Sequence, residues 1–296
     1  MKLVQTVVVR GEADVIDAHI AFHLNAGVDL VLVAGDELQD GVREILDSYA
    51  RLGYVRLVAE AGPAAAVEHG ADWVIPGDPG EFWWPRGESL KEILAAIPQR
   101  YGTVRGLVRQ FVPAADDGRF FAERMTVRHS VQHDADFRPE TSLRAVNRTG
   151  PVTGVPLRAW YPIEILRFTV PGAEPIAEPI AEQEREHGLG DGSLVVDTRL
   201  RDALHTLRAS GSETSGQFAV PTAGAGAFAF PTPDVVDDAA YAVECAAVGE
   251  VSLEKLERRI DELEAQLASL ERRFWSRVRG RVSRLARSSD RPDARP

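Results

Sequence analysis

The chain has 296 residues with 44% hydrophobic and 27% charged side chains, enough to bury one substantial core and leave appended segments. Its single cysteine, Cys245, excludes internal disulfides and cysteine-rich metal sites, and it favours a reducing compartment such as the cytoplasm. No stretch reaches the roughly 18 to 20 continuous apolar residues that span a bilayer, so we expect no membrane crossing. The start, MKLVQTVVVRGEAD, is expected to be a first strand rather than a signal peptide.

The net charge of −11 is distributed unevenly. Residues 272–296 hold nine arginines against two aspartates, so the rest of the chain is more acidic still. An acidic body disfavours nucleic-acid binding, because phosphate contacts need basic side chains. The tail segment FWSRVRGRVSRLAR is amphipathic and suits the inner face of an anionic membrane, with a solvated basic helix end as the alternative. We expect a cytoplasmic protein, with peripheral membrane contact as an option for this tail.

Strand and helix patterns alternate through the first eighty residues. The run LVQTVVV predicts a strand, and DVIDAHIAFHLNAG then predicts a helix that stops at a glycine. Further strands are predicted in VDLVLVAG, YVRLVAE and ADWVIPGD, with a helix in GVREILDSYARLG. This alternation predicts a mostly parallel sheet. Ligands bind at the carboxyl ends of parallel strands, so chemistry is expected at residues 10–14, 35–40 and 76–81.

The middle of the chain is predicted to be β-rich, with strands in TVRGLVRQFVP, FFAERMTVRHSV and WYPIEILRFTV. We expect one domain over residues 1–170. A linker and a small docked element are predicted over 171–208, where EPIA occurs twice and GSLVVDTRLRDALHTL has a strand-like start and an amphipathic end. The segment 209–235, rich in Gly, Ala, Ser, Thr and Pro, predicts a flexible linker.

A heptad seam marks the last part of the chain. After a predicted short helix and turn over 236–251, leucine and other apolar residues recur in alternating steps of three and four from Leu253 to Phe274. This predicts a coiled coil that runs into the basic amphipathic helix over 252–287, followed by a disordered tail over 288–296. A coiled coil implies a homo-oligomer. The alternative is one amphipathic helix folded back on its own domain.

The polar turns VVVRGEAD, VAGDELQDG and IPGDPGEFWW, with the sequence between them, resemble bacterial family-2-type glycosyltransferases of the GT-A fold. Members typically read V-R-(N/D)-E-A-D, D-N-x-S-x-D-G-T and D-A-D-E-F-W at these turns. The resemblance covers residues 3–130 and resumes weakly at WYPIEILRF and LVVDTRLRDAL. It implies an α/β, GT-A-like (Rossmann-like), mostly parallel sheet domain, followed here by the C-terminal coiled-coil helix. It also implies transfer of a sugar from a nucleoside diphosphate sugar to a glycan, lipid or protein acceptor.

At the first turn, the resemblance places Arg10, Glu12 and Asp14 beside the nucleotide. Glu12 and Asp14 would equally serve to open a helix, where carboxylates complement the positive end of the dipole. At the second turn, Asp36 falls where the family has Asn, and Asp40 matches the family's Asp. Asp36 could accept hydrogen bonds from a base or ribose. The alternative is a solvated loop in which Asp40 caps the next helix.

At the third turn, Asp78 and Glu81 match the family's acidic motif, whereas Gly80 replaces its second Asp. In the family this motif holds a divalent cation, Mn²⁺ or Mg²⁺, that neutralises the leaving diphosphate. One or two carboxylates with phosphate oxygens suffice for Mg²⁺. The resemblance therefore implies Asp78 as a nucleotide-sugar contact and Asp78 with Glu81 as metal ligands. A surface turn is the alternative, since Asp-Pro-Gly is an ordinary turn sequence.

An inverting transfer needs a general base, typically a carboxylate within hydrogen-bond reach of the acceptor hydroxyl. Glu164 in YPIEILRF is the predicted catalytic residue, and Arg167 stands where relatives often have His. Three features depart from the family: Gly35 replaces an Asp, Gly80 replaces another Asp, and residues 59–72 form a short segment with no Arg or Lys. These departures favour an alternative function, a non-catalytic oligomeric scaffold or binding module. A peripheral membrane adaptor acting through the tail is a third hypothesis.

Two further features have both a functional and a packing interpretation. His19 and His23 have the i, i+4 spacing of zinc ligands on a helix, but packed histidines are the favoured interpretation because no zincin glutamate follows His19. Trp83 and Trp84 would stack on a sugar or base, or belong to the core.

Overall fold

In the computed structural model, the described residues are 1–11, 13–35, 38–130, 143–149, 155–157, 161–169, 188–190, 192–209, 214–215, 217–221 and 229–230. The chain divides into two compact units, residues 1–245 and 246–296. The predicted coiled coil over 252–287, the helix over 236–251, the tail after residue 287, and Glu12 and Asp36 lie outside the described residues.

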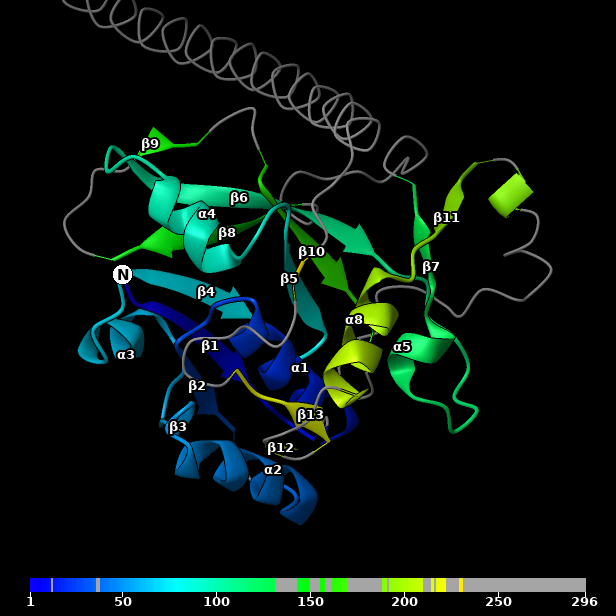
Figure 1. Ribbon diagram of the computed structural model, residues 1–296, viewed down its shortest axis with the longest axis horizontal. Coiled ribbons are helices and arrows are strands. Elements are labelled where there is room, and N and C mark those ends of the chain that lie inside the picture. The colour runs from blue at the N-terminus through cyan, green and yellow to red at the C-terminus, as the bar shows by residue number, and fades with distance from the viewer. Residues whose placement is uncertain are drawn as a thin grey trace, which may run out of the picture. The chain divides into compact units, whose positions relative to one another are not determined.

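The first part of the chain forms the alternating pattern that the sequence predicts (Figure 1). The elements are β1 (Leu3–Val8), α1 (Ala13–Asn25), β2 (Leu30–Ala34), α2 (Asp40–Arg51), β3 (Val55–Leu57), α3 (Pro63–Glu68) and β4 (Trp73–Gly77). β1 pairs in parallel with both β2 and β4, and β2 pairs in parallel with β3. The prediction of a mostly parallel α/β sheet is therefore confirmed.

The second part extends this sheet with strands of both directions. The further elements are β5 (Glu81–Pro85), α4 (Leu90–Ala96), β6 (Tyr101–Gln110), α5 (Phe121–Arg124), β7 (Val127–His129), β8 (Leu143–Arg148), β9 (Val155–Pro156), β10 (Ile163–Arg167), β11 (Leu194–Val196), α8 (Arg199–Ala209), β12 (Thr214–Ser215) and β13 (Phe218–Ala219). The main sheet has the order β3-β2-β1-β4-β8-β6-β10-β5, and β9 pairs with β6. β8 runs antiparallel to β4 and β6, and β5 runs antiparallel to β10.

Helices cover both faces of the parallel strands. Successive side chains of a strand point to opposite faces, so Val31 and Val33 of β2 join one core cluster with α1 and α2, while Leu30 and Leu32 join a second with Ala66 of α3. This two-sided burial explains why β2 is apolar at every position.

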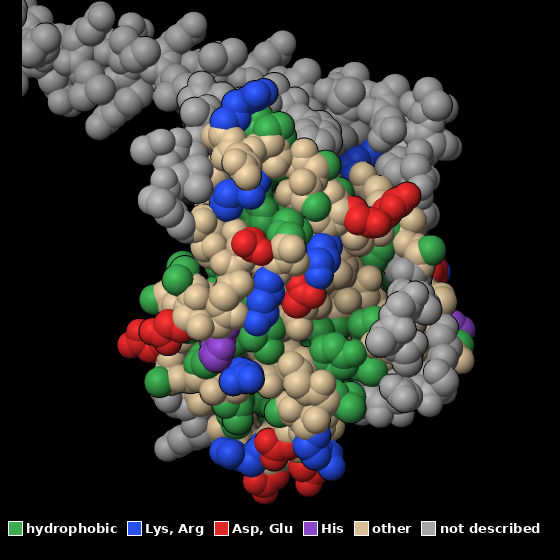
Figure 2. Space-filling model, turned by 60° about the vertical axis from the view of Figure 1, so that its left-hand side comes forward, with side chains coloured by type: hydrophobic (Ala, Val, Ile, Leu, Met, Phe, Trp, Pro, Cys, Tyr) green, Lys and Arg blue, Asp and Glu red, His purple; other side chains and the backbone are tan. Residues whose placement is uncertain are grey.

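The helix α2 shows how the outer surface is made. Its buried residues, Val42, Leu46 and Tyr49, recur at helical spacing and face the core. Its exposed side carries both signs of charge, and Figure 2 shows acidic and basic side chains interspersed, with both kinds at the lower end of the face, the level of α2.

The hydrophobic core reaches beyond residue 170, where the sequence led us to end the main domain. Leu204 of α8, Phe218 of β13 and Phe230 belong to the same core cluster as α1 and β5. α8 contacts α1, α5 and β13, and Figure 1 shows it beside α1. The described parts of the segment predicted as a flexible linker, 209–235, thus contribute side chains to the core. Within the described residues, no helix combines the length and apolar character needed to span a membrane.

Candidate functional site

The strand order marks one edge of the sheet as the candidate site. From β1 the chain proceeds to β2 and β3 on one side, and then crosses back to β4 on the other side of β1. In open α/β sheets, ligands bind outside the carboxyl ends of the strands at such a reversal of order. Here the reversal lies between the ends of β1 and β4. The predicted turns at residues 10–14 and 76–81 follow these two strands.

The antiparallel strands bring further charged residues to the same edge. β8 runs opposite to β4, so it begins beside the end of β4, and Arg144 is its second residue. β5 begins with Glu81, which lies opposite Arg167 at the end of β10. The side chains of Asp78, Glu81, Arg144 and Arg167 therefore meet. We call these four residues and Arg10 the edge cluster.

Glu81 is the centre of the edge cluster. Its side chain is only 3% exposed, and Oε1 accepts hydrogen bonds from Nε of Arg144 at 3.0 Å and from Nε of Arg167 at 2.9 Å. Nη2 of Arg167 donates to the same oxygen. A carboxylate this deeply buried needs paired cations, since its desolvation is otherwise costly. Glu81 thereby fixes the orientation of both guanidinium groups.

Asp78 lies at the solvent side of the cluster. Its side chain is 71% exposed, and Oδ2 lies 3.8 Å from Nη2 of Arg144. The partial desolvation of Asp78 and, after it, the negative charge of Glu81 raise the pKa of its carboxyl, while the charges of Arg144, Arg167 and Arg10 oppose this rise. The described side chains of the edge cluster are thus three arginines and two carboxylates.

The edge cluster does not fit the predicted metal site. A divalent cation on Oε1 of Glu81 would have to displace two guanidinium groups, and a cation on Oε2 would be repelled by the same two groups. In the part of the chain that the structure describes, no group of three His, Cys, Asp or Glu residues is placed to hold a metal ion. Asp78 alone keeps an exposed carboxylate, so the pairing of Asp78 with Glu81 on one cation is not supported.

The first two turns are only partly described. Arg10 is exposed, and its charge acts on Asp78. Asp14 lies in the first turn of α1, although its side chain is not described. Asp40 is exposed and is the first residue of α2, whose N-cap is Gln39 without a side-chain cap bond. The alternative prediction that Asp40 itself caps the helix is therefore wrong by one residue.

Close backbone packing explains the glycine at position 35. A Cβ at Gly35 would lie 2.5 Å from the carbonyl oxygen of Val9 and 2.7 Å from Cδ2 of Leu38. β1 and β2 approach each other there through a hydrogen bond from Val9 N to Ala34 O of 2.8 Å. An aspartate, which the family resemblance would place here, does not fit without movement of the β1 backbone.

Glu164 is not placed as a general base. It is 1% exposed, and its carboxylate is bound by Arg109 Nε at 2.5 Å, Arg199 Nη1 at 2.6 Å and Arg86 Nη1 at 3.4 Å. Burial alone would raise its pKa, but the charges and hydrogen bonds of Arg109 and Arg199 hold the pKa far below its usual value. Such a carboxylate neither reaches an acceptor hydroxyl nor takes up a proton near neutral pH.

The ion pairs of Glu164 instead attach α8 to the sheet. Arg199, the first residue of α8, also binds Asp197, and Asp197 binds Arg128 of β7 at 2.9 Å. These links join β10, α8 and β7, which are separated in sequence, so periodicity along the chain does not reveal them. The ion-pair network around Glu164 therefore stabilises the packing of these elements.

The two histidines of α1 pack against the turn that carries Asp78 and Glu81. His19 and His23 are fully buried, as the favoured interpretation required. His23 Nε2 accepts a hydrogen bond from Trp83 N at 3.2 Å, so its Nδ1 carries the proton and donates to His19 O at 2.8 Å. Burial lowers the pKa of His19 to about 3, and burial with the His19 charge lowers that of His23. Trp83 and Trp84 are buried core residues.

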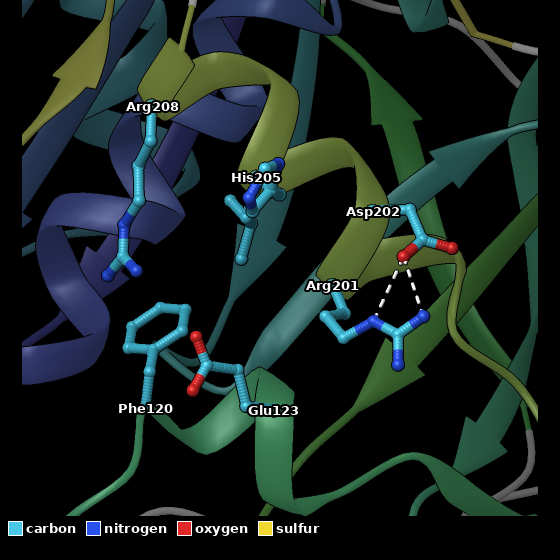
Figure 3. A pocket seen from close by; sticks show the side chains of 7 residues that line it. Phe120, Glu123, Arg201, Asp202, His205 and Arg208 are labelled. Carbon is cyan, nitrogen blue, oxygen red and sulfur yellow. Dashed lines mark hydrogen bonds and ion pairs between the residues drawn. The ribbon is translucent and has the colours of Figure 1, made fainter.

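A cavity of about 440 Å³ lies between α5 and α8 (Figure 3). Its lining residues are Phe120, Glu123, Arg201, Asp202, Leu204, His205 and Arg208. The guanidinium of Arg208 stacks over the rings of Phe120 at 4.3 Å and Phe218 at 4.9 Å. Sequence reasoning missed this cavity, because its walls come from segments eighty residues apart that show no shared motif.

The fold and the edge cluster define the chain as an α/β protein with a charged site at a reversal of strand order. No protein-family model matches the chain. No curated protein matches it either. Among solved structures, it is similar to S. aureus TarS 1–349 in complex with UDP, with a TM-score of 0.33 and 13% sequence identity. That similarity covers 50% of this chain and 47% of the TarS chain, so only about half of either protein is compared.

Proposed function

We propose that the chain binds a nucleoside diphosphate sugar at the edge cluster and transfers the sugar to a glycan, lipid or protein acceptor. The observation that carries this proposal is the meeting of Arg10, Asp78, Glu81, Arg144 and Arg167 at the reversal between β1 and β4. Two of the three turns that resemble the glycosyltransferase motifs follow these strands. The positions of the motifs and the order of the strands therefore both favour the edge cluster as the binding site.

The chemistry of this edge suits a diphosphate leaving group. Breaking the bond between a sugar and a diphosphate builds negative charge on the diphosphate oxygens, and positioned cationic donors stabilise that charge. The edge cluster supplies guanidinium groups, and α1 starts in the same turn with the positive end of its dipole. The described residues thus include groups suited to the diphosphate of the sugar donor, whereas Glu164 is not available as a base for the acceptor hydroxyl.

A second candidate function is nucleotide-sugar binding without transfer. The specific observation in its favour is Glu164, whose carboxylate is enclosed by Arg109, Arg199 and Arg86 and is not available as a base. In that case the domain would act as a binding module or scaffold. Self-association through residues 252–287 and membrane contact through residues 272–296 remain proposals for both functions.

Isothermal titration with UDP, GDP and dTDP tests the shared binding step. Incubation with the corresponding nucleotide sugars, followed by measurement of released nucleoside diphosphate with and without acceptors, tests the transfer step. Binding with release supports the transferase. Binding without release supports the second candidate, and failure to bind any of the three nucleotides contradicts both.

A further inference from the structure

We infer that the edge cluster holds the diphosphate through the guanidinium group of Arg144, oriented by Glu81 beside Arg167, and that it does so without a divalent cation. This inference rests on the proposed function and concerns how the same site neutralises its ligand. It departs from the cation that the glycosyltransferase resemblance implies.

The first observation is the state of Glu81. Its Oε1 receives donors from both Arg144 and Arg167, and the side chain has almost no contact with solvent. Oε1 already accepts three hydrogen bonds and so has no lone pair left for a cation, and a cation on Oε2 of the same carboxylate would lie close to both guanidinium groups. Glu81 is therefore a positioning residue that locks two long, flexible side chains.

The second observation is the reach of Arg144. Its side chain is 38% exposed, in contrast to 11% for Arg167. Its Nε is engaged by Glu81, whereas Nη2 lies 3.8 Å from Asp78 Oδ2, which is beyond hydrogen-bond distance. The Nη donors of Arg144 are thus presented at the solvent side of the cluster. A planar guanidinium in a fixed orientation matches two phosphate oxygens at once.

The third observation is the balance of charge. Arg144 and Arg167 both bind Glu81, so a divalent cation added beside this carboxylate would be repelled by two guanidinium groups. A diphosphate anion is attracted by the same two guanidinium groups, whereas the exposed carboxylate of Asp78 opposes it. Arginines that are held in place lose little side-chain entropy on binding, which favours affinity.

Titration of the full chain with UDP, GDP and dTDP in the presence of EDTA, and again with Mg²⁺ or Mn²⁺, tests the inference. We expect one nucleotide to bind with about the same Kd in both conditions. Arg144→Gln should weaken this binding by about tenfold or more, the effect of losing a charge-assisted hydrogen bond. Arg56→Gln is the matched control and should bind normally. Arg56 is an exposed arginine of β3, the terminal strand of the sheet on the side away from β8 and β10.

Asp78→Asn gives opposite results for the two ways of holding the diphosphate. If arginines hold it, Asp78→Asn removes a repelling charge, so the variant should bind the nucleotide in EDTA as tightly as the parent or tighter. If a cation on Asp78 holds it, the variant should bind less tightly in the presence of Mg²⁺ or Mn²⁺. Glu81→Gln releases the two guanidinium groups that Glu81 orients, so it should weaken binding in EDTA. Asp78 is exposed, so Asp78→Asn should fold even where the buried Glu81→Gln does not.

Binding that appears only with Mg²⁺ or Mn²⁺ and is lost in Asp78→Asn would overturn the inference and leave the proposed function intact. Failure of every nucleotide to bind, with or without a cation, would overturn both.

Discussion

Nδ1 of His19 lies 2.9 Å from the carbonyl oxygen of Pro79, and this hydrogen bond joins α1 to the turn between Asp78 and Glu81. The histidine is fully buried and its pKa is about 3, so the ring is neutral at neutral pH and Nδ1 carries the donated proton. A helix that follows β1 is thereby fastened to the turn that follows β4.

Replacing His19 by Phe should destabilise the domain by about 1–3 kcal/mol, because the buried Pro79 carbonyl loses its donor. Chemical denaturation measures the change. It should also weaken nucleotide binding, because the Asp78–Glu81 turn loses its anchor to α1. His205→Gln, at an exposed histidine of α8, is the control and should leave stability nearly unchanged. A His19→Phe variant as stable as the parent would show that the anchor contributes nothing.

Stability should fall as the pH drops below about 6.5. His19 and His23 stay neutral when folded, whereas in the unfolded chain they take up protons below 6.5, so the unfolded state binds more protons. Each histidine should lower the free energy of unfolding by about 1.4 kcal/mol per pH unit between pH 6 and 5. Urea denaturation at several pH values measures the slope, which His19→Phe should reduce by about half. A slope of zero in the parent would contradict the buried neutral pair.

Glu164→Gln should behave as a structural variant rather than a catalytic one. Removing this carboxylate breaks the buried ion pair between Glu164 and Arg109, and breaking a buried pair costs about 3–5 kcal/mol. We expect a lower midpoint of thermal unfolding and, if transfer activity is found, unchanged kcat for the folded fraction. Glu123→Gln, at an exposed glutamate of α5, is the control. A fully stable Glu164→Gln protein with greatly reduced kcat would restore the general-base role.

Two glycine variants should have opposite signs. Gly35→Ala should destabilise by about 1–3 kcal/mol, because its Cβ would approach the Val9 carbonyl oxygen at 2.5 Å. Gly41→Ala should stabilise by about 0.5–1 kcal/mol, because Gly41 lies in α2 with no atom within 4 Å of its Cβ position. Paired urea denaturation curves measure both. A neutral Gly35→Ala would mean that β1 and β2 can separate at little cost.

Local pattern was enough to predict much of this fold. Alternating apolar runs and helical spacing identified β1 to β4 with α1 and α2, and the rule that ligands lie at carboxyl ends selected the turns after β1 and β4. Asp78, Glu81 and Arg10 were among the residues so selected. These inferences depend only on neighbours within about ten residues along the chain, where periodicity reports directly on burial.

Only the tertiary structure decided what those residues do. The partners of Glu81 stand 63 and 86 positions away, and it is strand register that brings Arg144 and Arg167 onto one carboxylate oxygen. The same holds for Glu164, which register places in a buried group of arginines rather than at the edge. A carboxylate in the sequence is equally suited to a cation, a proton or a guanidinium. Its role depends on burial and on the charges packed around it, which are properties of the folded chain.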